Sequence, residues 1–293
     1  MNRIPHQPLA SAGFMLAAAA LVAGTTLLAK MAGAEGLHPL QVSHGRFLFA
    51  FIGIATATLV LRPTFTRPQW GTHAARSLSG WTGISLTFAA VQFIPLADAT
   101  AISFLNPVVA MLLAIPVLKE TVGPWRWAAA VIALAGGAIL LRPGAGALEP
   151  GALIALAAAL AMGVEITIIK FLTGRERPLQ ILVINNGMGL TIATVAVLAT
   201  GVFVMPTPKA WLILAGIGAM MALAQTCFIQ SMRRADASFA SPFFYATLVF
   251  AALYDGAVFG TWPDRVSLAG AGVILAGGVL LAWREGRLKR APG

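Results

Sequence analysis

The chain contains 293 residues, of which 58% are hydrophobic and only 10% are charged, and its mean hydropathy is +0.84. A soluble globular domain has about 25% charged and about 45–50% apolar residues, so this composition excludes an ordinary water-soluble fold. The net charge of +10 arises from short basic segments between apolar runs, not from a basic stripe interleaved with aromatic residues, so we expect no nucleic-acid partner. The single cysteine, Cys227, excludes an intrachain disulfide and a cysteine-based metal motif.

Ten apolar stretches are long enough to cross a bilayer, whose core of about 30 Å needs about 20 helical residues. The third and fourth stretches cannot form one helix, because residues 77–118 would span about 60 Å, so we predict a turn near Pro95 and Asp98. The first stretch is longer than the apolar run of a signal peptide. The sequence therefore predicts an all-α polytopic membrane protein with ten transmembrane helices. The expected spans are residues 9–32, 39–61, 77–95, 98–118, 124–142, 151–172, 179–204, 209–232, 237–260 and 266–283.

The distribution of Lys and Arg predicts the orientation of these spans. If the N-terminus is cytoplasmic, the inside segments hold fourteen of these residues, Arg76 among them, and the outside segments hold only Arg142, Lys209 and Arg265. Cytoplasmic loops of membrane proteins are enriched in Lys and Arg. We therefore expect a multi-pass protein of a bacterial-type cytoplasmic (inner) membrane, with both termini in the cytoplasm.

Short segments of the first half recur in the second half at nearly constant offsets of 138 to 141 residues. The recurring pairs are Ala97-Asp98-Ala99 with Ala235-Asp236-Ala237, Lys30 with Lys170, and residues 134–137 with residues 275–278. Five spans per half is an odd number, so the two copies lie in opposite orientations across the bilayer. Inverted repeats of this kind place a substrate site near the membrane midplane. The sequence predicts two five-helix repeats, residues 1–143 and 144–293.

These segments also carry a family resemblance. Residues 97–107, Ala-Asp-Ala-Thr-Ala-Ile-Ser-Phe-Leu-Asn-Pro, followed by Glu120, resemble the signature of the EamA-type permeases of the drug/metabolite transporter superfamily. One departure is Thr261, where such permeases commonly have Glu before Pro-Asp. The resemblance implies two inverted five-helix halves around a central cavity lined mainly by the first four helices of each half. The matching segments of the second half are residues 235–238, 241–245 and 259–264.

Four ionisable residues inside the expected spans are candidates for substrate binding or gating, because a charge within the membrane is costly. Arg46 and Asp255 have comparable depths below the outer surface, so we predict that they form an ion pair, which serves either as a gate or as a helix-fixing contact. Lys30 lies nearer the outer surface, where it can snorkel. Glu165 does not share a face with Lys170 and needs another partner; it carries a proton, receives a substrate cation or is merely structural.

Uncharged polar and aromatic side chains form a second group of candidates. Amides both donate and accept hydrogen bonds, which suits a zwitterionic or heterocyclic ligand as well as contacts between helices. Prolines within spans remove a helical hydrogen bond, so they act either as hinges or as static bends. The substrate-binding candidates are Asn106, Asn185, Asn186, Gln225, Tyr245 and Trp81, and the hinge candidates are Pro107 and Pro242.

The fifth and tenth spans are predicted to be scaffold helices. Small residues recur four apart at Ala133 and Gly137 and at Gly272 and Ala276, which permits close contact between helices. A homodimer formed through these helices and a monomer both remain open.

The resulting prediction is a secondary transporter that moves a small polar or zwitterionic, amino-acid-like metabolite by alternating access, with export as the expected direction. No phosphate-binding Gly-x-x-x-x-Gly-Lys-Ser/Thr loop and no protease or metalloenzyme motif occur in the sequence, so we expect no cofactor, no metal and no enzymatic activity. A proton is a possible coupling ion. The resemblance also leaves open import of a vitamin or nucleoside-like metabolite of the riboflavin or S-adenosylmethionine type, or export of an opine metallophore. A channel and an intramembrane enzyme are the remaining classes.

Overall fold

The computed structural model describes residues 7–106, 108–110, 112–113, 123–141, 149–173, 176–232, 234 and 243–288, and the regular structure within them is helical. Six of the ten helices begin with proline, whose missing N–H costs nothing in the first helical turn and whose φ is already helical. The helices are α1 (Pro8–Ala34), α2 (Pro39–Leu61), α3 (Trp70–Ala90), α4 (Leu96–Ser103), α6 (Pro124–Leu141), α7 (Pro150–Thr173), α8 (Pro178–Thr200), α9 (Pro208–Met232), α11 (Ala246–Phe259) and α12 (Arg265–Leu288).

The helices follow the predicted spans, with corrections at three of them. α1, α2, α7, α8 and α9 are long and apolar enough to cross a membrane, and the turn before α4 falls at Pro95 as expected. α3 runs from Trp70 to Ala90 rather than from residue 77 to 95, because its early polar residues His73 and Arg76 are buried as α3 packs against α7 and α8. α4 ends at Ser103, before a turn at residues 104–105, so the expected span 98–118 is not one continuous helix, and α12 continues to Leu288 rather than ending at residue 283. The hinge candidates Pro107 and Pro242 and the predicted repeat boundary at 143/144 lie outside the described residues.

The helix contacts have twofold symmetry. α1 packs against α9 as α3 packs against α7; α2 packs against α9 as α3 packs against α8; and α1 packs against α11 as α4 packs against α7. Exchanging α1, α2, α3, α4 and α6 with α7, α8, α9, α11 and α12 maps each of these contacts onto its counterpart, whereas the smaller contacts α2–α3 and α4–α12 have no counterpart of comparable extent. The pairs α2–α8, α4–α11 and α6–α12 map onto themselves. The chain thus forms two inverted halves, related by an axis that crosses the helices.

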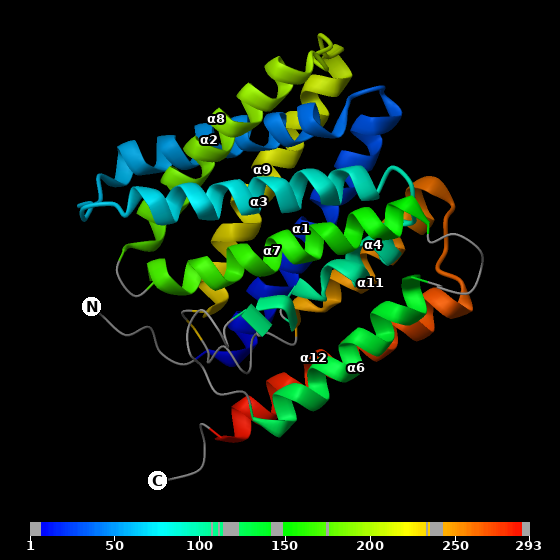
Figure 1. Ribbon diagram of the computed structural model, residues 1–293. Helices are drawn as coiled ribbons and strands as arrows, with labels where there is room; N and C mark the ends of the chain where they lie inside the picture. Colours follow the sequence, from blue (N-terminus) through cyan, green and yellow to red (C-terminus); the bar gives the residue numbers. More distant parts are fainter. Residues whose placement is uncertain are drawn as a thin grey trace.

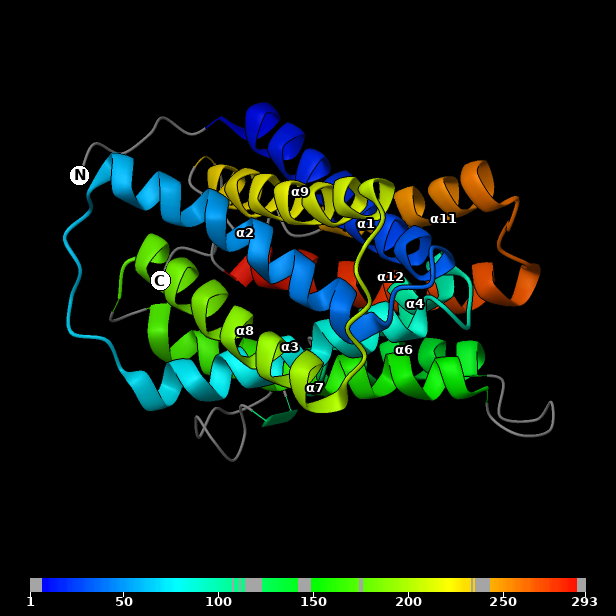
Figure 2. The ribbon, with the colours of Figure 1, turned by 90° about the horizontal axis from the view of Figure 1, so that it is seen from above.

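The helices run between two ends of the molecule. We call the end that carries loop 62–69 and Glu176 the Glu176 end, and the end that carries loops 35–38, 91–95, 201–207 and 260–264 the Asp255 end. α1 runs from the Glu176 end to the Asp255 end, and α7 runs the opposite way (Figure 1). α1 begins and α12 ends at the Glu176 end, which is on the left in Figures 1 and 2.

The interior is packed with small side chains, and large apolar side chains cover the outside. Alanines such as Ala23, Ala99 and Ala155 are fully buried between helices. Small residues let helix backbones approach closely, which is how helices pack in a membrane without a hydrophobic driving force between them. Leu198 and Leu212 expose more than 70% of their surface on the outside of the bundle, as side chains that face lipid do.

Two buried glutamines hold one loop each at opposite ends of the molecule. Gln41, the third residue of α2, donates from Nε2 to the carbonyl oxygen of Val204 at 2.5 Å and accepts from the Val204 N–H at 3.1 Å. Gln180, the third residue of α8, accepts from the Thr66 N–H at 2.8 Å and donates to the Thr66 carbonyl at 3.1 Å. Because α2 and α8 correspond, the inverted symmetry extends to individual hydrogen bonds.

A buried carboxylate, Glu176, adjoins Gln180 at the Glu176 end, whereas the residue four positions before Gln41 is Leu37. Glu176 accepts from Gln180 Nε2 at 2.6 Å and from the Gln69 N–H at 3.0 Å, and it lies 2.8 Å from His73 Nε2. Burial raises the pKa of the Glu176 carboxyl, but hydrogen bonds from His73, Gln69 and Gln180 outweigh burial and hold this pKa below its ordinary value of 4.5. The carboxylate is therefore the stabilised form.

This carboxylate gives a testable pH dependence. A depressed pKa in the folded state means that the ionised carboxylate stabilises the protein above the unfolded pKa of 4.5 and that this contribution is lost as the pH falls through the folded pKa. We expect Glu176→Gln to lower the free energy of unfolding at pH 7 by about 1–3 kcal/mol, the worth of hydrogen bonds to a charged group. Apparent unfolding temperatures measured in detergent between pH 7 and pH 3 check this.

The control is Glu149→Gln, which changes an exposed carboxylate at the Asp255 end. We expect this variant to match the wild type at every pH. The expectation for Glu176 is wrong if the difference between Glu176→Gln and wild type is as large in acid as at pH 7.

Candidate functional site

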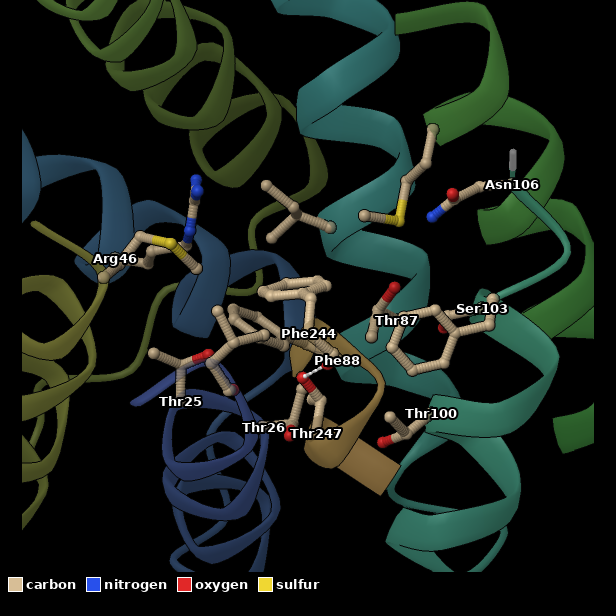
Figure 3. A pocket seen from close by; sticks show the side chains of 15 residues that line it. Thr25, Thr26, Arg46, Thr87, Phe88, Thr100, Ser103, Asn106, Phe244 and Thr247 are labelled. Carbon is tan, nitrogen blue, oxygen red and sulfur yellow. Dashed lines mark hydrogen bonds between the residues drawn. The ribbon is translucent and has the colours of Figure 1, made fainter. Parts of the chain in front are cut away.

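A cavity of about 140 Å³ lies between helices from both halves of the molecule (Figure 3). α1, α2, α3 and α4 of the first half contribute most of its wall, and α7, α9 and α11 of the second half complete it. This agrees with the location between the halves that the inverted repeat implies. Its lining residues are Val22, Thr25, Thr26, Arg46, Ile84, Thr87, Phe88, Thr100, Ser103, Phe104, Asn106, Met162, Met221, Phe244 and Thr247.

The hydroxyl groups on the cavity wall have their protons engaged within their own helices. Thr25 donates to the Val22 carbonyl at 2.7 Å, Thr87 donates to the Gly83 carbonyl at 2.9 Å, and Thr26, Thr100, Ser103 and Thr247 make the same kind of bond. A hydroxyl that already donates retains free lone pairs. The wall therefore offers hydrogen-bond acceptors to the N–H and O–H groups of a ligand.

Aromatic rings supply the apolar part of the wall. Phe88, Phe104 and Phe244 line the cavity, and the rings of Phe104 and Phe244 meet edge to face with centroids 6.1 Å apart. Figure 3 shows Arg46 on one side of the cavity, Ser103 and Asn106 on the opposite side, and Phe244 between them. Such a site can hold a flat ring against phenyl groups and accept hydrogen bonds from its polar edges.

A second cavity, of about 280 Å³, adjoins the first one. The two cavities share Val22, Met221 and Phe244 as lining residues. The second cavity adds Arg76 and Leu182, which lie in the early turns of α3 and α8, and therefore extends toward the Glu176 end. Its remaining lining residues are Ala224, Gln225 and Phe228.

Arg46 and Arg76 are the cations of these cavities. Arg46 is 3% exposed, its Cζ lies 4.4 Å from the centre of the Phe47 ring, and its Nε and Nη1 have no hydrogen-bond partner among the described residues. Arg76 is 6% exposed, donates from Nη1 to the Ile181 carbonyl at 3.4 Å, and has Nη2 3.5 Å from Glu165 Oε1. Glu165 thus has the partner that the sequence required, on α3.

The predicted ion pair between Arg46 and Asp255 is wrong. Asp255 pairs instead with Lys30, whose Nζ lies 2.6 Å from Oδ1, and its Oδ2 accepts from the Leu96 N–H at 2.9 Å. The reason is packing: α11 contacts α1 and α4, whereas α2 contacts α8, α9 and α3. Lys30 also lies 4.6 Å from the centre of the Phe259 ring, so this cation is held in place rather than extended toward the surface.

The other predicted residues divide into cavity and helix contacts. Asn106 lines the first cavity and Gln225 the second. Asn185 accepts from Ser77 Oγ at 3.2 Å, which joins α8 to α3. Asn186 donates to the Leu182 carbonyl at 2.9 Å, and the ring centroids of Tyr245 and Phe104 are 5.0 Å apart. The predicted residues that line neither of these two cavities are Asn185, Asn186, Trp81, Tyr245, Glu165, Lys30 and Asp255.

Sequence reasoning missed Arg76 and the hydroxyl groups. The sequence predicts Arg76 as a cation of an inside loop, because it precedes the third expected span, which begins at residue 77. The helix-compatible run from Trp70 was the available signal. Threonine and serine occur throughout the chain, so only the fold identifies the few that face the cavity.

Helices of two inverted halves that enclose a polar and aromatic cavity define a membrane transporter of the inverted-repeat class. The model of the EamA-like transporter family matches residues 9–142 and 149–283. The chain therefore belongs to the EamA-like transporter family.

Individual relatives agree with this assignment. The riboflavin transporter of Vibrio cholerae is 29% identical over 294 residues, and the match covers 98% of each chain. The S-adenosylmethionine uptake transporter of Rickettsia bellii is 24% identical over 250 residues, with 85% of each chain covered. A solved structure described as a crystal structure of a protein has a TM-score of 0.62 and 21% identity, covers 94% of this chain and 97% of its own, and supports the fold. The protein is accordingly a multi-pass membrane transporter of a small metabolite.

Proposed function

We propose that the protein transports a flat aromatic metabolite with hydroxyl or N–H donors, of the riboflavin class, across the cytoplasmic (inner) membrane. The observation that carries this proposal is the cavity wall that combines Phe88, Phe104 and Phe244 with hydroxyl oxygens free to accept. An isoalloxazine ring would stack on phenyl groups, and a ribityl chain would donate to the hydroxyls. The similarity to a relative named riboflavin transporter supports the same class.

The charges of the cavities favour this substrate class over the amino-acid-like one that the sequence suggested. The described lining of both cavities contains two cations, Arg46 and Arg76, and no carboxylate. A zwitterion or a cationic sulfonium compound would bring its positive group into a low-dielectric site without a partner, which is costly. A neutral or anionic aromatic solute avoids this cost.

We place the Glu176 end in the cytoplasm. Loop 62–69 contains Arg62 and Arg67, and Arg177 follows Glu176, whereas the loops of the Asp255 end defined above contain no Lys or Arg. The distribution of Lys and Arg in short loops sets the orientation of membrane proteins. In this orientation, the second cavity extends the site toward the cytoplasm, and the Lys30–Asp255 pair lies on the outer side. Rocking of the two halves would then expose the site to either side, and coupling to a proton remains a prediction.

Uptake by a riboflavin auxotroph that lacks its own transporter tests this proposal. We expect cells that express the protein to take up labelled riboflavin saturably. Phe244→Ala should raise the KM roughly 5- to 150-fold, because stacking of a ring on an aromatic side chain is worth about 1–3 kcal/mol. The matched control is Phe203→Ala, which alters a half-exposed ring in loop 201–207.

Competition distinguishes the substrate classes in the same assay. We expect lumichrome, which retains the ring system, to compete with riboflavin, and a mixture of amino acids to leave uptake unchanged. The proposal is contradicted if cells that express the protein take up no riboflavin but accumulate or extrude amino acids. That result would favour the amino-acid-like substrate that the sequence predicts.

A further inference from the structure

Two buried arginines, Arg46 and Arg76, and the partly buried Glu165 lie together beside the two cavities. Glu165 interacts electrostatically with both Arg46 and Arg76, and the two arginines also act on each other. Glu165 reaches Arg76 at 3.5 Å, while Nε and Nη1 of Arg46 have no acceptor in the described part of the chain. A single carboxylate, that of Glu165, is therefore the negative charge near two positively charged guanidinium groups.

A buried N–H group without an acceptor is costly, because it has lost its hydration without a replacement, and Arg46 has two such nitrogens among the described residues. Arg46 cannot solve this by reaching water, because it is 3% exposed and held against the Phe47 ring. Arg46 lines the first cavity, on the side opposite Asn106 (Figure 3). A ligand in this cavity that brought a negative charge would complete the electrostatic balance of the site.

We propose that Arg46 and Arg76 form a subsite for an anionic group of the transported solute, and that Glu165 is the internal carboxylate that competes for Arg76. This inference rests on the proposed function: among flat aromatic solutes, it predicts that those carrying a carboxylate or a phosphate bind more tightly than neutral ones such as riboflavin. Arginine is suited to both groups, since its planar fork binds two oxygens at once.

The contacts of Arg76 are weak enough to be exchanged. Charge-assisted hydrogen bonds in proteins are about 2.7–2.9 Å long, whereas the contacts of Arg76 with Glu165 and with the Ile181 carbonyl are 3.5 Å and 3.4 Å. The Glu165 carboxylate is seated over Gly80, where an added Cβ would lie 2.8 Å from it. The absence of a side chain at Gly80 leaves the space that the Glu165 carboxylate occupies.

Matched ligand pairs that differ only in charge test the subsite on the purified protein in detergent. One pair is 2-naphthoate and 2-naphthamide, and the other is riboflavin 5′-phosphate and riboflavin; the first tests a carboxylate and the second a phosphate. We expect at least one anionic member to bind at least tenfold more tightly than its neutral partner, as measured by thermal shift titration. Arg46→Gln should abolish this preference, while Arg46→Lys, which keeps the charge, should retain part of it.

Glu165→Gln gives the decisive measurement, because it predicts a gain that misfolding cannot produce. Removal of the competing carboxylate leaves two unmatched cations, so the anionic probe should bind about tenfold more tightly than to wild type. Arg67→Gln, an exposed arginine in loop 62–69, is the charge-matched control and should change nothing. Two results would contradict the proposed anionic subsite. One is equal affinity of the wild type for the charged and neutral members of both pairs; the other is weaker binding of the anionic probe to Glu165→Gln than to the wild type.

The two proposals fail separately. If riboflavin is taken up but neither ligand pair shows a charge preference, the anionic subsite is wrong and the proposed function stands. If the anionic probes bind with the expected preference but no flavin is transported, the riboflavin class is wrong and the subsite stands.

Discussion

Replacement of Asp255 by Asn is expected to lower the free energy of unfolding by about 3 kcal/mol. Breaking a buried ion pair costs about 3–5 kcal/mol, because it leaves a charge without its partner. We take the lower end because the Lys30 side chain is 18% exposed and keeps access to water. Since Asn retains an oxygen that can accept from the Leu96 N–H, the loss reports mainly the charge of Asp255. An apparent unfolding temperature lower by about 6–12 °C would follow for a chain of this size.

The double variant Lys30→Met/Asp255→Asn tests why Asp255→Asn loses stability. It distinguishes the cost of leaving Lys30 without a partner from the loss of the ion-pair attraction itself. With both charges removed, neither group is left uncompensated, so most of the lost stability should return. Glu35→Gln is a control at the same end of the molecule: it breaks the pair with Lys209, whose side chain is 67% exposed, and should cost less than about 1 kcal/mol. A double variant as unstable as Asp255→Asn would contradict this account.

Transport by the double variant then distinguishes a gate from a scaffold contact. Lys30 and Asp255 join α1 to α11, and the Leu96 N–H joins α4 to the same carboxylate. If the pair forms only when the Asp255 end is closed, the stable double variant should exchange solute at a changed rate. A contact that persists in all states predicts the wild-type rate.

Most of the architecture could be predicted from the sequence, because it depends on quantities that the sequence carries directly. Apolar length locates helices, so the ends of α2 and the first residues of α1, α7 and α8 fall within a few residues of the predicted spans. Pro95 marks the turn into α4 because proline ends one helix and readily begins the next. An odd number of spans per half dictates the inverted arrangement that the helix contacts display.

The partners of individual side chains could not be predicted, because they depend on how each helix is rotated and which helix it meets. Depth alone made Arg46 and Asp255 candidates for a pair, yet Asp255 faces Lys30 because α11 packs on α1. Arg76 seemed to belong to a loop, because hydropathy cannot distinguish a polar helix turn buried by neighbours from a solvated one. The charged subsite and its unmatched cation therefore emerge only from the fold.

The same limit applies to the glycines of the scaffold helices. The sequence predicts close contact at Gly137 and Gly272, but a Cβ added at Gly272 would meet no atom of the described residues within 4 Å. The close approach of α6 and α12 occurs at Gly136, where an added Cβ would lie 2.7 Å from the carbonyl oxygen of Gly270 and from the backbone nitrogen of Ile274. Backbone atoms cannot rotate out of the way, so a methyl group there forces the two helices apart.

The loss of stability caused by three alanine substitutions should therefore depend on which atoms the new methyl group contacts. Gly136→Ala is expected to cost about 1–3 kcal/mol, the range for overpacking a tight interface, and Gly136→Leu should cost more. Gly137→Ala meets the Cδ1 of Leu105 at 2.7 Å and should cost less, because that side chain can turn away. Gly272→Ala should be neutral or slightly stabilising, since alanine favours a helix over glycine. Apparent unfolding temperatures in detergent give the order, and a Gly136→Ala variant as stable as Gly272→Ala would show that α6 and α12 do not pack through Gly136.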